Sequence, residues 1–167
     1  GFSLHGRTDL GIVKELLNKH GVEFTEEHFS RLCSRYFRLL PDELRRRSQG
    51  RVLPGVKKIL EQVSQWEHVL CGLLTGNMPT SARSKLEHFD LWHFFDFGIY
   101  GDQVAERPAL SSLALHAVEK RAGQPLAPER IVVVGDTPLD VRLAHAMGAR
   151  CLAVETGGFD AGQLQDE

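Results

Sequence analysis

The feature that most constrains the fold is a run of β-branched residues that stops at a glycine and an acid. Ile131 to Val134 are four β-branched apolar residues, and Gly135 and Asp136 follow at once. Such a run is typical of a strand in a parallel sheet, buried on both faces. Pro138 then suits the first turn of a helix. The pattern predicts a βα unit with Asp136 at the carboxyl end of a central strand, where open α/β sheets bind their ligands.

A second carboxylate, Asp140, follows Asp136 by four residues, at the start of the predicted helix. Two carboxylates at the mouth of a sheet offer the oxygen ligands that a hard cation such as Mg²⁺ prefers. The simpler interpretation is that both residues only cap and charge the N-terminus of the helix. The segment by itself leaves both interpretations open.

The chain from residue 68 onward alternates between strand and helix patterns. Alternation of this kind predicts an α/β fold, with right-handed βαβ units in a Rossmann-like, doubly wound parallel sheet. The expected elements are a strand at about 68–74, a helix at about 79–88, a strand at about 97–100, a helix at about 108–121, a strand at 131–134, a helix at about 138–147 and a strand at about 150–154.

The first third of the chain reads as helical and forms a small lobe of its own. Thr8 or Asp9 can cap one helix, and Thr25 can cap a second. The pattern changes to alternating strands and helices shortly after residue 50. We therefore expect two units, a partial α-helical cap at 1–50 and an α/β core at 51–167.

Composition and charge narrow the possible partners. The 167-residue chain has a net charge of −2 and 42% apolar residues, as soluble globular proteins do. It has no basic excess that would attract nucleic acid, and no apolar run approaches the roughly 18 residues of a membrane span. Its three widely spaced cysteines are typical of reduced core thiols. We expect a cytoplasmic monomer or homodimer with no nucleic-acid or membrane partner.

Two further strand ends carry polar residues. Thr75, Gly76 and Asn77 would bring a hydroxyl, an amide and free backbone N–H groups to the same sheet edge as Asp136. Such groups near a helix N-terminus suit a phosphate, although an ordinary strand-to-helix turn has a similar composition. The next strand leads to Arg107, whose guanidinium either reaches an anion at this edge or lies on the surface.

Taken together, the order and spacing of these segments resemble the haloacid dehalogenase superfamily, and within it the Mg²⁺-dependent phosphatases similar to phosphoglycolate phosphatase. The resemblance covers nearly the whole chain, and its most specific part is Gly135-Asp136-Thr137-Pro138-Leu139-Asp140. It implies that Asp136 ligates Mg²⁺ directly, with Asp140 in support.

The same resemblance assigns roles at the other strand ends. It implies that the Thr75 hydroxyl binds the phosphoryl group, with Gly76 and Asn77 beside it. It also places Arg107 next to the phosphate, at a position where the family usually has a lysine. Arginine keeps the positive charge of lysine, but its planar guanidinium has a fork of donors, whereas the lysine ammonium is a compact point charge. Lys85, within the preceding helix pattern, is a poorer match for this position.

One motif of the family is missing. The family's first strand ends in Asp-x-Asp, whose first Asp is the nucleophile and whose second is the general acid and base, and no such segment occurs here. In the family this strand lies between the strand ending at Thr75 and the strand ending at Gly135. Since the chain begins at Gly1 and ends soon after Phe159, we expect it to be truncated at both ends, with the nucleophile upstream.

The resemblance therefore implies a Mg²⁺-dependent phosphomonoester hydrolase that acts on a small phosphorylated metabolite through an aspartyl-phosphate. Thr75, Arg107 and Asp136 would take part in catalysis, and the chain as given would be inactive without Asp-x-Asp. Two alternatives stay open: an inactive phosphate- and Mg²⁺-binding protein or gene fragment, and a phosphomutase. Dehalogenation is disfavoured because that reaction needs no metal, whereas Asp136 and Asp140 resemble metal ligands. A receiver-like domain is disfavoured because the acidic pair lies late in the chain and a helical lobe precedes the sheet.

Overall fold

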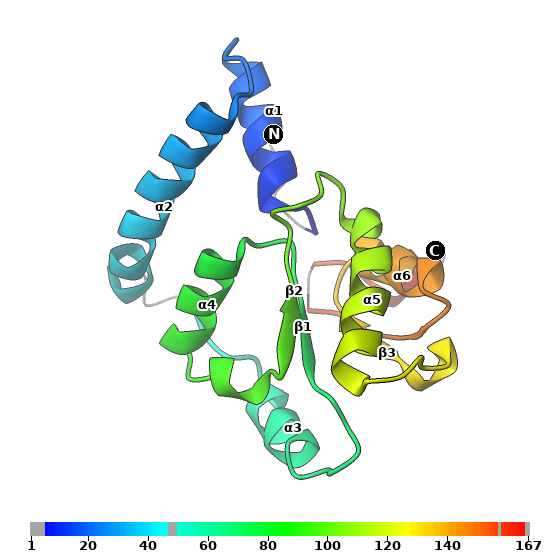
Figure 1. Cartoon of the computed structure of the whole chain (residues 1–167). Coiled ribbons are helices and arrows are strands. Elements are labelled where there is room, and N and C mark those ends of the chain that lie inside the picture. The colour runs from blue at the N-terminus through cyan, green and yellow to red at the C-terminus, as the bar shows by residue number, and fades with distance from the viewer. Residues whose placement is uncertain (1–5, 47–49, 157, 166–167) are drawn as a thin grey trace.

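The computed structural model of the chain describes residues 6–46, 50–156 and 158–165 (Figure 1). The predicted alternation of strands and helices is confirmed, with boundaries that shift by a few residues; the first strand is shorter than the predicted 68–74. In chain order the elements are α1 (Asp9–Lys19), α2 (Glu26–Arg46), α3 (Val56–Val63), β1 (Gly72–Leu74), α4 (Pro79–His88), η1 (Trp92–Phe94), β2 (Phe97–Ile99), η2 (Arg107–Ala109), α5 (Leu110–Ala122), η3 (Pro128–Arg130), β3 (Val132–Gly135), α6 (Pro138–Ala146), β4 (Arg150–Ala153) and α7 (Ala161–Gln165), where η marks a 3₁₀ turn.

The strands that the structure describes form two parallel ladders. β1 pairs with β2, and β3 pairs with β4. Each ladder is a βαβ unit, since α4 lies between β1 and β2 in the chain and α6 lies between β3 and β4. Within the described residues, β1 and β3 are not paired with each other. Figure 1 shows the β1–β2 ladder between α4 and α5.

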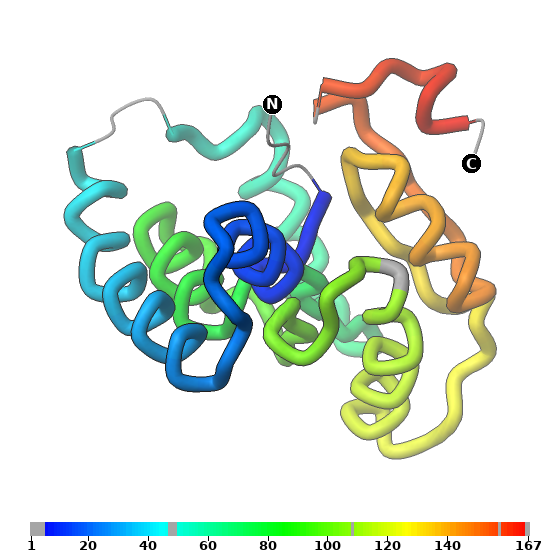
Figure 2. The backbone as a smooth tube through the Cα atoms, turned by 90° about the horizontal axis from the view of Figure 1, so that it is seen from above, coloured from blue at the N-terminus to red at the C-terminus, as the bar shows by residue number. Residues whose placement is uncertain are grey.

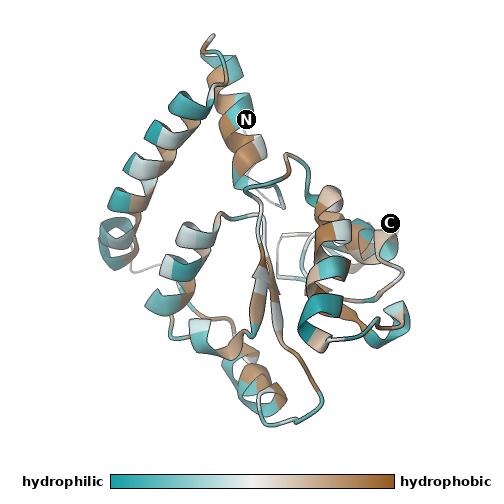
Figure 3. Ribbon diagram, in the orientation of Figure 1, coloured by the Kyte–Doolittle hydropathy of each residue, from teal (hydrophilic) through white to brown (hydrophobic). Residues whose placement is uncertain are grey.

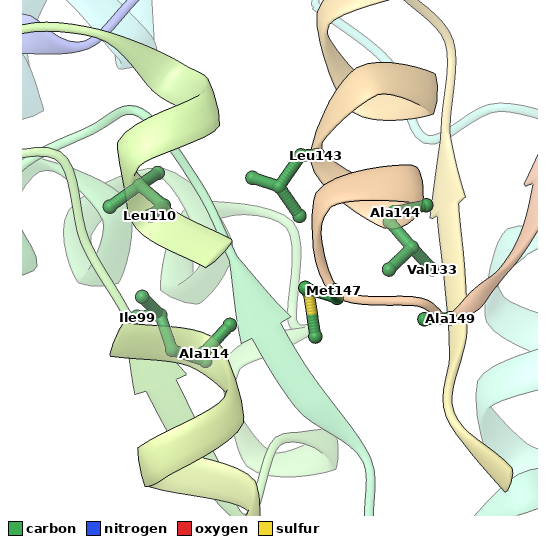
Figure 4. Close-up of a cluster of buried hydrophobic side chains, with 8 residues drawn as sticks. All are labelled: Ile99, Leu110, Ala114, Val133, Leu143, Ala144, Met147 and Ala149. Atoms are coloured by element: carbon green, nitrogen blue, oxygen red, sulfur yellow. The ribbon is translucent and has the colours of Figure 1, made fainter. Parts of the chain in front are cut away.

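A hydrophobic cluster holds the two ladders in one packed unit. Leu110 of α5 and Leu143 of α6 are completely buried at its centre. Burying a leucine side chain contributes about 1.5–3 kcal/mol. Because the cluster includes residues of both β2 and β3, the two helices α5 and α6 join the ladders. The buried members are Ile99, Leu110, Ala114, Val133, Leu143, Ala144, Met147 and Ala149 (Figure 4).

The strand that carries the acidic pair, β3, is buried on one face only. Val133 is 7% exposed, whereas Val132 and Val134 are 48% and 63% exposed. The prediction of a central strand buried on both faces is therefore wrong for the described structure. Successive side chains of a strand point to opposite faces, and the buried cluster with α6 covers only the Val133 face. β3 also has a single neighbouring strand, β4.

The helices α1 and α2 form a lobe that extends from the strand ends (Figures 1 and 2). The caps predicted for these helices are confirmed: the Thr8 hydroxyl accepts a hydrogen bond from Gly11 N, and the Thr25 hydroxyl accepts one from His28 N, both at 3.1 Å. Much of α2 is hydrophilic (Figure 3), and the thiol of its buried Cys33 lies 3.4 Å from Sδ of Met78, the N-cap residue of α4. No helix in the described ranges is both long and apolar enough to cross a membrane.

Candidate active site

Asp140 is buried at the start of α6, and both of its carboxylate oxygens are engaged. Its side chain is 4% exposed, and Oδ1 lies 2.5 Å from Nη2 of Arg107. Oδ2 accepts hydrogen bonds from the backbone N–H groups of Asp136 and Thr137, both at 3.2 Å, and from the Thr137 hydroxyl at 2.9 Å. Asp140 therefore caps α6, as the simpler interpretation of the sequence held, and in addition it pairs with a cation.

Gly135 permits this arrangement. A Cβ atom at Gly135 would lie 2.3 Å from Cβ and 2.6 Å from Oδ2 of Asp140. Both distances are far below van der Waals contact, so a larger residue at this position would displace the capping carboxylate. The glycine that ends the apolar run is thus required by the close approach of Asp140 to the strand end.

Asp136 differs from Asp140 in how much of its carboxylate the protein uses. It is half-buried at the end of β3, and the one hydrogen bond that its side chain accepts from the described residues is to Oδ2, from the Thr156 hydroxyl at 3.2 Å. A carboxylate with so little competition from protein donors fits a hard cation such as Mg²⁺, which commonly combines one or two carboxylates with substrate phosphate and water. The described residues contain no cluster of three or more His, Cys, Asp or Glu side chains that could enclose a metal on their own.

Arg107 lies in η2 and is nearly buried, with 15% of its side chain exposed. One of its nitrogens pairs with Asp140, and its Nε is buried with no hydrogen-bond partner in the described part of the chain. A buried N–H donor of a guanidinium is costly to leave unpaired. Arg107 therefore carries a donor that suits an anion next to the acidic pair.

Thr75 and Asn77 form a compact hydrogen-bonded turn at the end of β1. The Thr75 hydroxyl oxygen accepts hydrogen bonds from the backbone N–H of Asn77 at 3.1 Å and from its side-chain Nδ2 at 2.8 Å. The Oδ1 atom of Asn77 accepts a hydrogen bond from Nζ of Lys85. The structure thus places the Asn77 side chain against Thr75 and Lys85.

One short segment, Gly6 and Arg7, contacts both of the strand ends that are predicted to share a site. A Cβ atom at Gly6 would lie 3.0 Å from the Thr137 hydroxyl oxygen, and one at Gly76 would lie 2.1 Å from the Arg7 carbonyl oxygen. Neighbouring Cα atoms are about 3.8 Å apart. The loop after β1 and the loop after β3 therefore contact adjacent residues of the same segment.

Asp9 connects the start of α1 to the loop after β1, a role that the sequence did not predict. Its Oδ2 accepts hydrogen bonds from Met78 N at 2.8 Å and from the buried Ser81 hydroxyl at 3.1 Å, and its own N–H donates to the Gly76 carbonyl at 2.6 Å. The start of α1 is thereby docked on the loop between β1 and α4. No local pattern could reveal these bonds, because Asp9 and Met78 are 69 residues apart.

Lys85 is the second residue whose position the sequence did not reveal. It lies on α4, half-buried, and points its ammonium at Asn77. Burial lowers the pKa of Lys85 from its ordinary value of 10.5, and the nearby Asp9 carboxylate partly opposes this shift. Asn77 precedes α4 and Lys85 lies in its last turn, eight residues later, so no local pattern in the sequence indicates their contact.

A hollow of about 640 Å³ lies beside this region, between α1 and the loop that precedes η2. Arg7, Lys14, Ala105 and Glu106 are among the residues that line it. None of the predicted phosphate- or metal-binding residues does so. The hollow therefore lies outside the predicted site.

Similarity to known proteins agrees with this fold. The chain is 30% identical over 95 residues to a phosphorylated carbohydrates phosphatase of Thermotoga maritima, covering 57% of this chain and 42% of that protein. It is 31% identical over 106 residues to a phosphoglycolate phosphatase of Pseudomonas savastanoi pv. phaseolicola, covering 64% of this chain and 38% of that protein. The chain thus spans less than half the length of these relatives.

A solved structure confirms the predicted fold class, a Rossmann-like α/β core with a helical cap. The crystal structure of a hydrolase from Pseudomonas syringae superimposes with a TM-score of 0.66 at 24% identity, over 97% of this chain and 71% of that one. The sequence model of the haloacid dehalogenase-like hydrolases matches residues 8–154. That match includes both strand ends of the site and most of the helical lobe, and the chain accordingly belongs to the haloacid dehalogenase-like hydrolase family.

Proposed function

We propose that the natural protein carrying this chain is a Mg²⁺-dependent phosphomonoester hydrolase that acts on a small phosphorylated metabolite. The observation that carries the proposal is the arrangement at the end of β3. There, within the described residues, the Asp136 carboxylate accepts a single hydrogen bond, and Arg107, which pairs with Asp140, has a buried Nε–H without a partner. A carboxylate for a cation next to a donor for an anion suits a phosphate–Mg²⁺ pair. The phosphatase names of the relatives support the same reaction class.

In the proposed reaction, the residues of this chain bind and polarise the phosphoryl group. The Thr75 hydroxyl, the backbone N–H of Gly76 and the Arg107 guanidinium donate to the phosphoryl oxygens as charge shifts onto them. Asp136 and, behind it, Asp140 would hold Mg²⁺, which when bound neutralises phosphate charge. Asp140 would act indirectly, because both of its oxygens are already engaged.

The nucleophile of the proposal is an Asp upstream of Gly1. Its carboxylate attacks phosphorus, the P–O bond to the alcohol breaks, and the alcohol leaves with a proton supplied by the second Asp of the same motif. Water then hydrolyses the aspartyl-phosphate and releases inorganic phosphate. The helical lobe at 1–50 would cover the site and select the substrate.

The proposal also includes a cytoplasmic location and a monomeric or homodimeric state. The three cysteines, Cys33, Cys71 and Cys151, are free thiols in the structure, which supports a reducing compartment.

The test is turnover of p-nitrophenyl phosphate by the natural protein, together with the coding sequence upstream of Gly1. We expect an in-frame strand ending in Asp-x-Asp, and phosphate release that requires Mg²⁺, stops with a chelator and is abolished by Asp136→Asn. The matched control is Asp42→Asn, which removes an exposed carboxylate paired with Arg45 on α2 and should leave turnover unchanged.

Two results would contradict the hydrolase. Binding of inorganic phosphate without turnover by the natural protein would favour the inactive binding protein. Transfer of phosphate between two positions of a sugar, without release, would favour the phosphomutase.

A further inference from the structure

We propose that Lys85 and Asn77 are positioning residues that turn the hydroxyl proton of Thr75 toward the bound phosphoryl group. The inference rests on the proposed function, since it concerns how the phosphate end of that site is prepared. It is carried by three hydrogen bonds. The Lys85 ammonium donates to Asn77 Oδ1, and the Thr75 hydroxyl oxygen accepts from both Nδ2 and the backbone N–H of Asn77.

The orientation of the Asn77 amide follows from the chemistry of Lys85. An ammonium group has three donors and no acceptor, so it can bond only to the carbonyl oxygen of an amide. The Oδ1 atom of Asn77 must therefore face Lys85. Its Nδ2 atom, a donor only, must then face the Thr75 hydroxyl oxygen, which lies 2.8 Å away. The ammonium thus excludes the flipped amide.

The orientation of the Thr75 proton follows in turn. A hydroxyl oxygen has two lone pairs and one proton. Both lone pairs of Thr75 are used, by the side-chain Nδ2 and the backbone N–H of Asn77. The proton therefore points away from Asn77, and the described part of the chain presents no acceptor to it. A hydroxyl held as an obligatory donor suits an anion at the strand end.

The placement of Lys85 is unusual for a merely structural lysine. Its ammonium is half-buried and is bonded to a neutral amide rather than to a carboxylate. Burial lowers the pKa of its side chain, which means that the protonated form loses solvation there.

The test is a double-mutant cycle in the natural full-length protein, read as kcat/KM for p-nitrophenyl phosphate. Thr75→Val should lower kcat/KM about 100-fold, as the loss of one donor to a developing charge does. Lys85→Met should lower it about tenfold when Thr75 is present. In the Thr75→Val background, Lys85→Met should change it by less than about twofold, because the hydroxyl that Lys85 orients is gone. An equal tenfold loss in both backgrounds would overturn the inference.

A second variant guards against loss of folding. Asn77→Asp keeps a partner for Lys85 but replaces the Nδ2 donor by an acceptor, which the Thr75 proton would then satisfy. We expect a folded protein with an unchanged thermal midpoint, weaker binding of inorganic phosphate in calorimetry, and no further weakening when Thr75→Val is already present. Equal weakening in both backgrounds would show a simple charge effect and overturn the inference.

The two proposals fail in distinguishable ways. A wild-type protein that neither binds inorganic phosphate nor turns over a phosphomonoester overturns the proposed function, and the inference with it. An active wild type whose Lys85 and Thr75 losses are additive overturns the inference alone.

Discussion

The two strand ends that form the candidate site are built in different ways. At the end of β3, the capping bonds of Asp140 come from residues at most four positions away, and one buried ion pair to Arg107 is added. At the end of β1, the turn at Thr75 depends on Lys85 and on Asp9, which reaches it from the helical lobe. The acidic end is therefore organised mainly by its own segment, whereas the phosphate end is organised by docking of the lobe.

This difference has an energetic consequence. The Arg107–Asp140 pair is buried, and a buried pair is most costly when one partner is removed, because the other charge stays behind without solvent. The start of α1 is docked by single hydrogen bonds, two of which are accepted by the Asp9 carboxylate, and each is worth about 0.5–3 kcal/mol. We expect damage to the acidic end to destabilise the fold more than damage to the phosphate end.

The largest expected effect comes from Asp140→Ala. It leaves the Arg107 charge buried without its partner and removes the acceptor for three donors at the start of α6. The free energy of unfolding should fall by about 3–5 kcal/mol, measured by urea denaturation of the natural protein. The matched control, Asp136→Ala, loses one hydrogen bond and should cost less than about 1 kcal/mol. Equal losses of unfolding free energy in the two variants would contradict the view that Asp140 is structural and Asp136 is not.

A smaller effect is expected from Gly76→Ala, which tests the docking of the lobe. The new Cβ would lie 2.1 Å from the Arg7 carbonyl oxygen, so the start of α1 must move. Overpacking of this kind costs about 1–3 kcal/mol, and hydrogen exchange of the α1 amides should accelerate. Gly162→Ala, in the short helix α7, is the control. Its Cβ would lie 3.3 Å from Asp160 Oδ1, a much milder contact, so it should cost less than Gly76→Ala and leave exchange in α1 unchanged. Unchanged exchange in α1 would contradict the docking role of this contact.

The smallest effect is a pH dependence that belongs to the phosphate end. Burial lowers the folded-state pKa of Lys85 below its ordinary value of 10.5. Between these two values the unfolded chain binds more protons, so the contribution of Lys85 to the unfolding free energy rises with pH. The difference in unfolding free energy between wild type and Lys85→Met should therefore increase as the pH rises from neutral toward 10.5. A flat or falling difference would contradict the burial of a charged lysine.

Local segments of the site could be predicted from the sequence. The apolar run, the glycine and the four-residue spacing from Asp136 to Asp140 predicted a strand, a turn and a capped helix, and the structure has all three. Local backbone geometry links residues this close, so the Asp140 carboxylate at the helix start reaches the backbone N–H groups of Asp136 and Thr137. The same reasoning placed Thr75 directly after a strand.

Contacts between distant segments were decided only by the tertiary structure. The pairing of Arg107 with Asp140, the docking of Asp9 on Met78 and Ser81, and the exposure of Val134 depend on how helices and ladders pack. A run of apolar residues indicates that a strand is suited to burial. Which of its faces is buried depends on the helices and strands that pack against it. The amino-acid sequence by itself thus determined the identity and local geometry of the two strand ends. Their partners were decided by packing over long sequence separations, because the energies of such contacts depend on distances that no local spacing specifies.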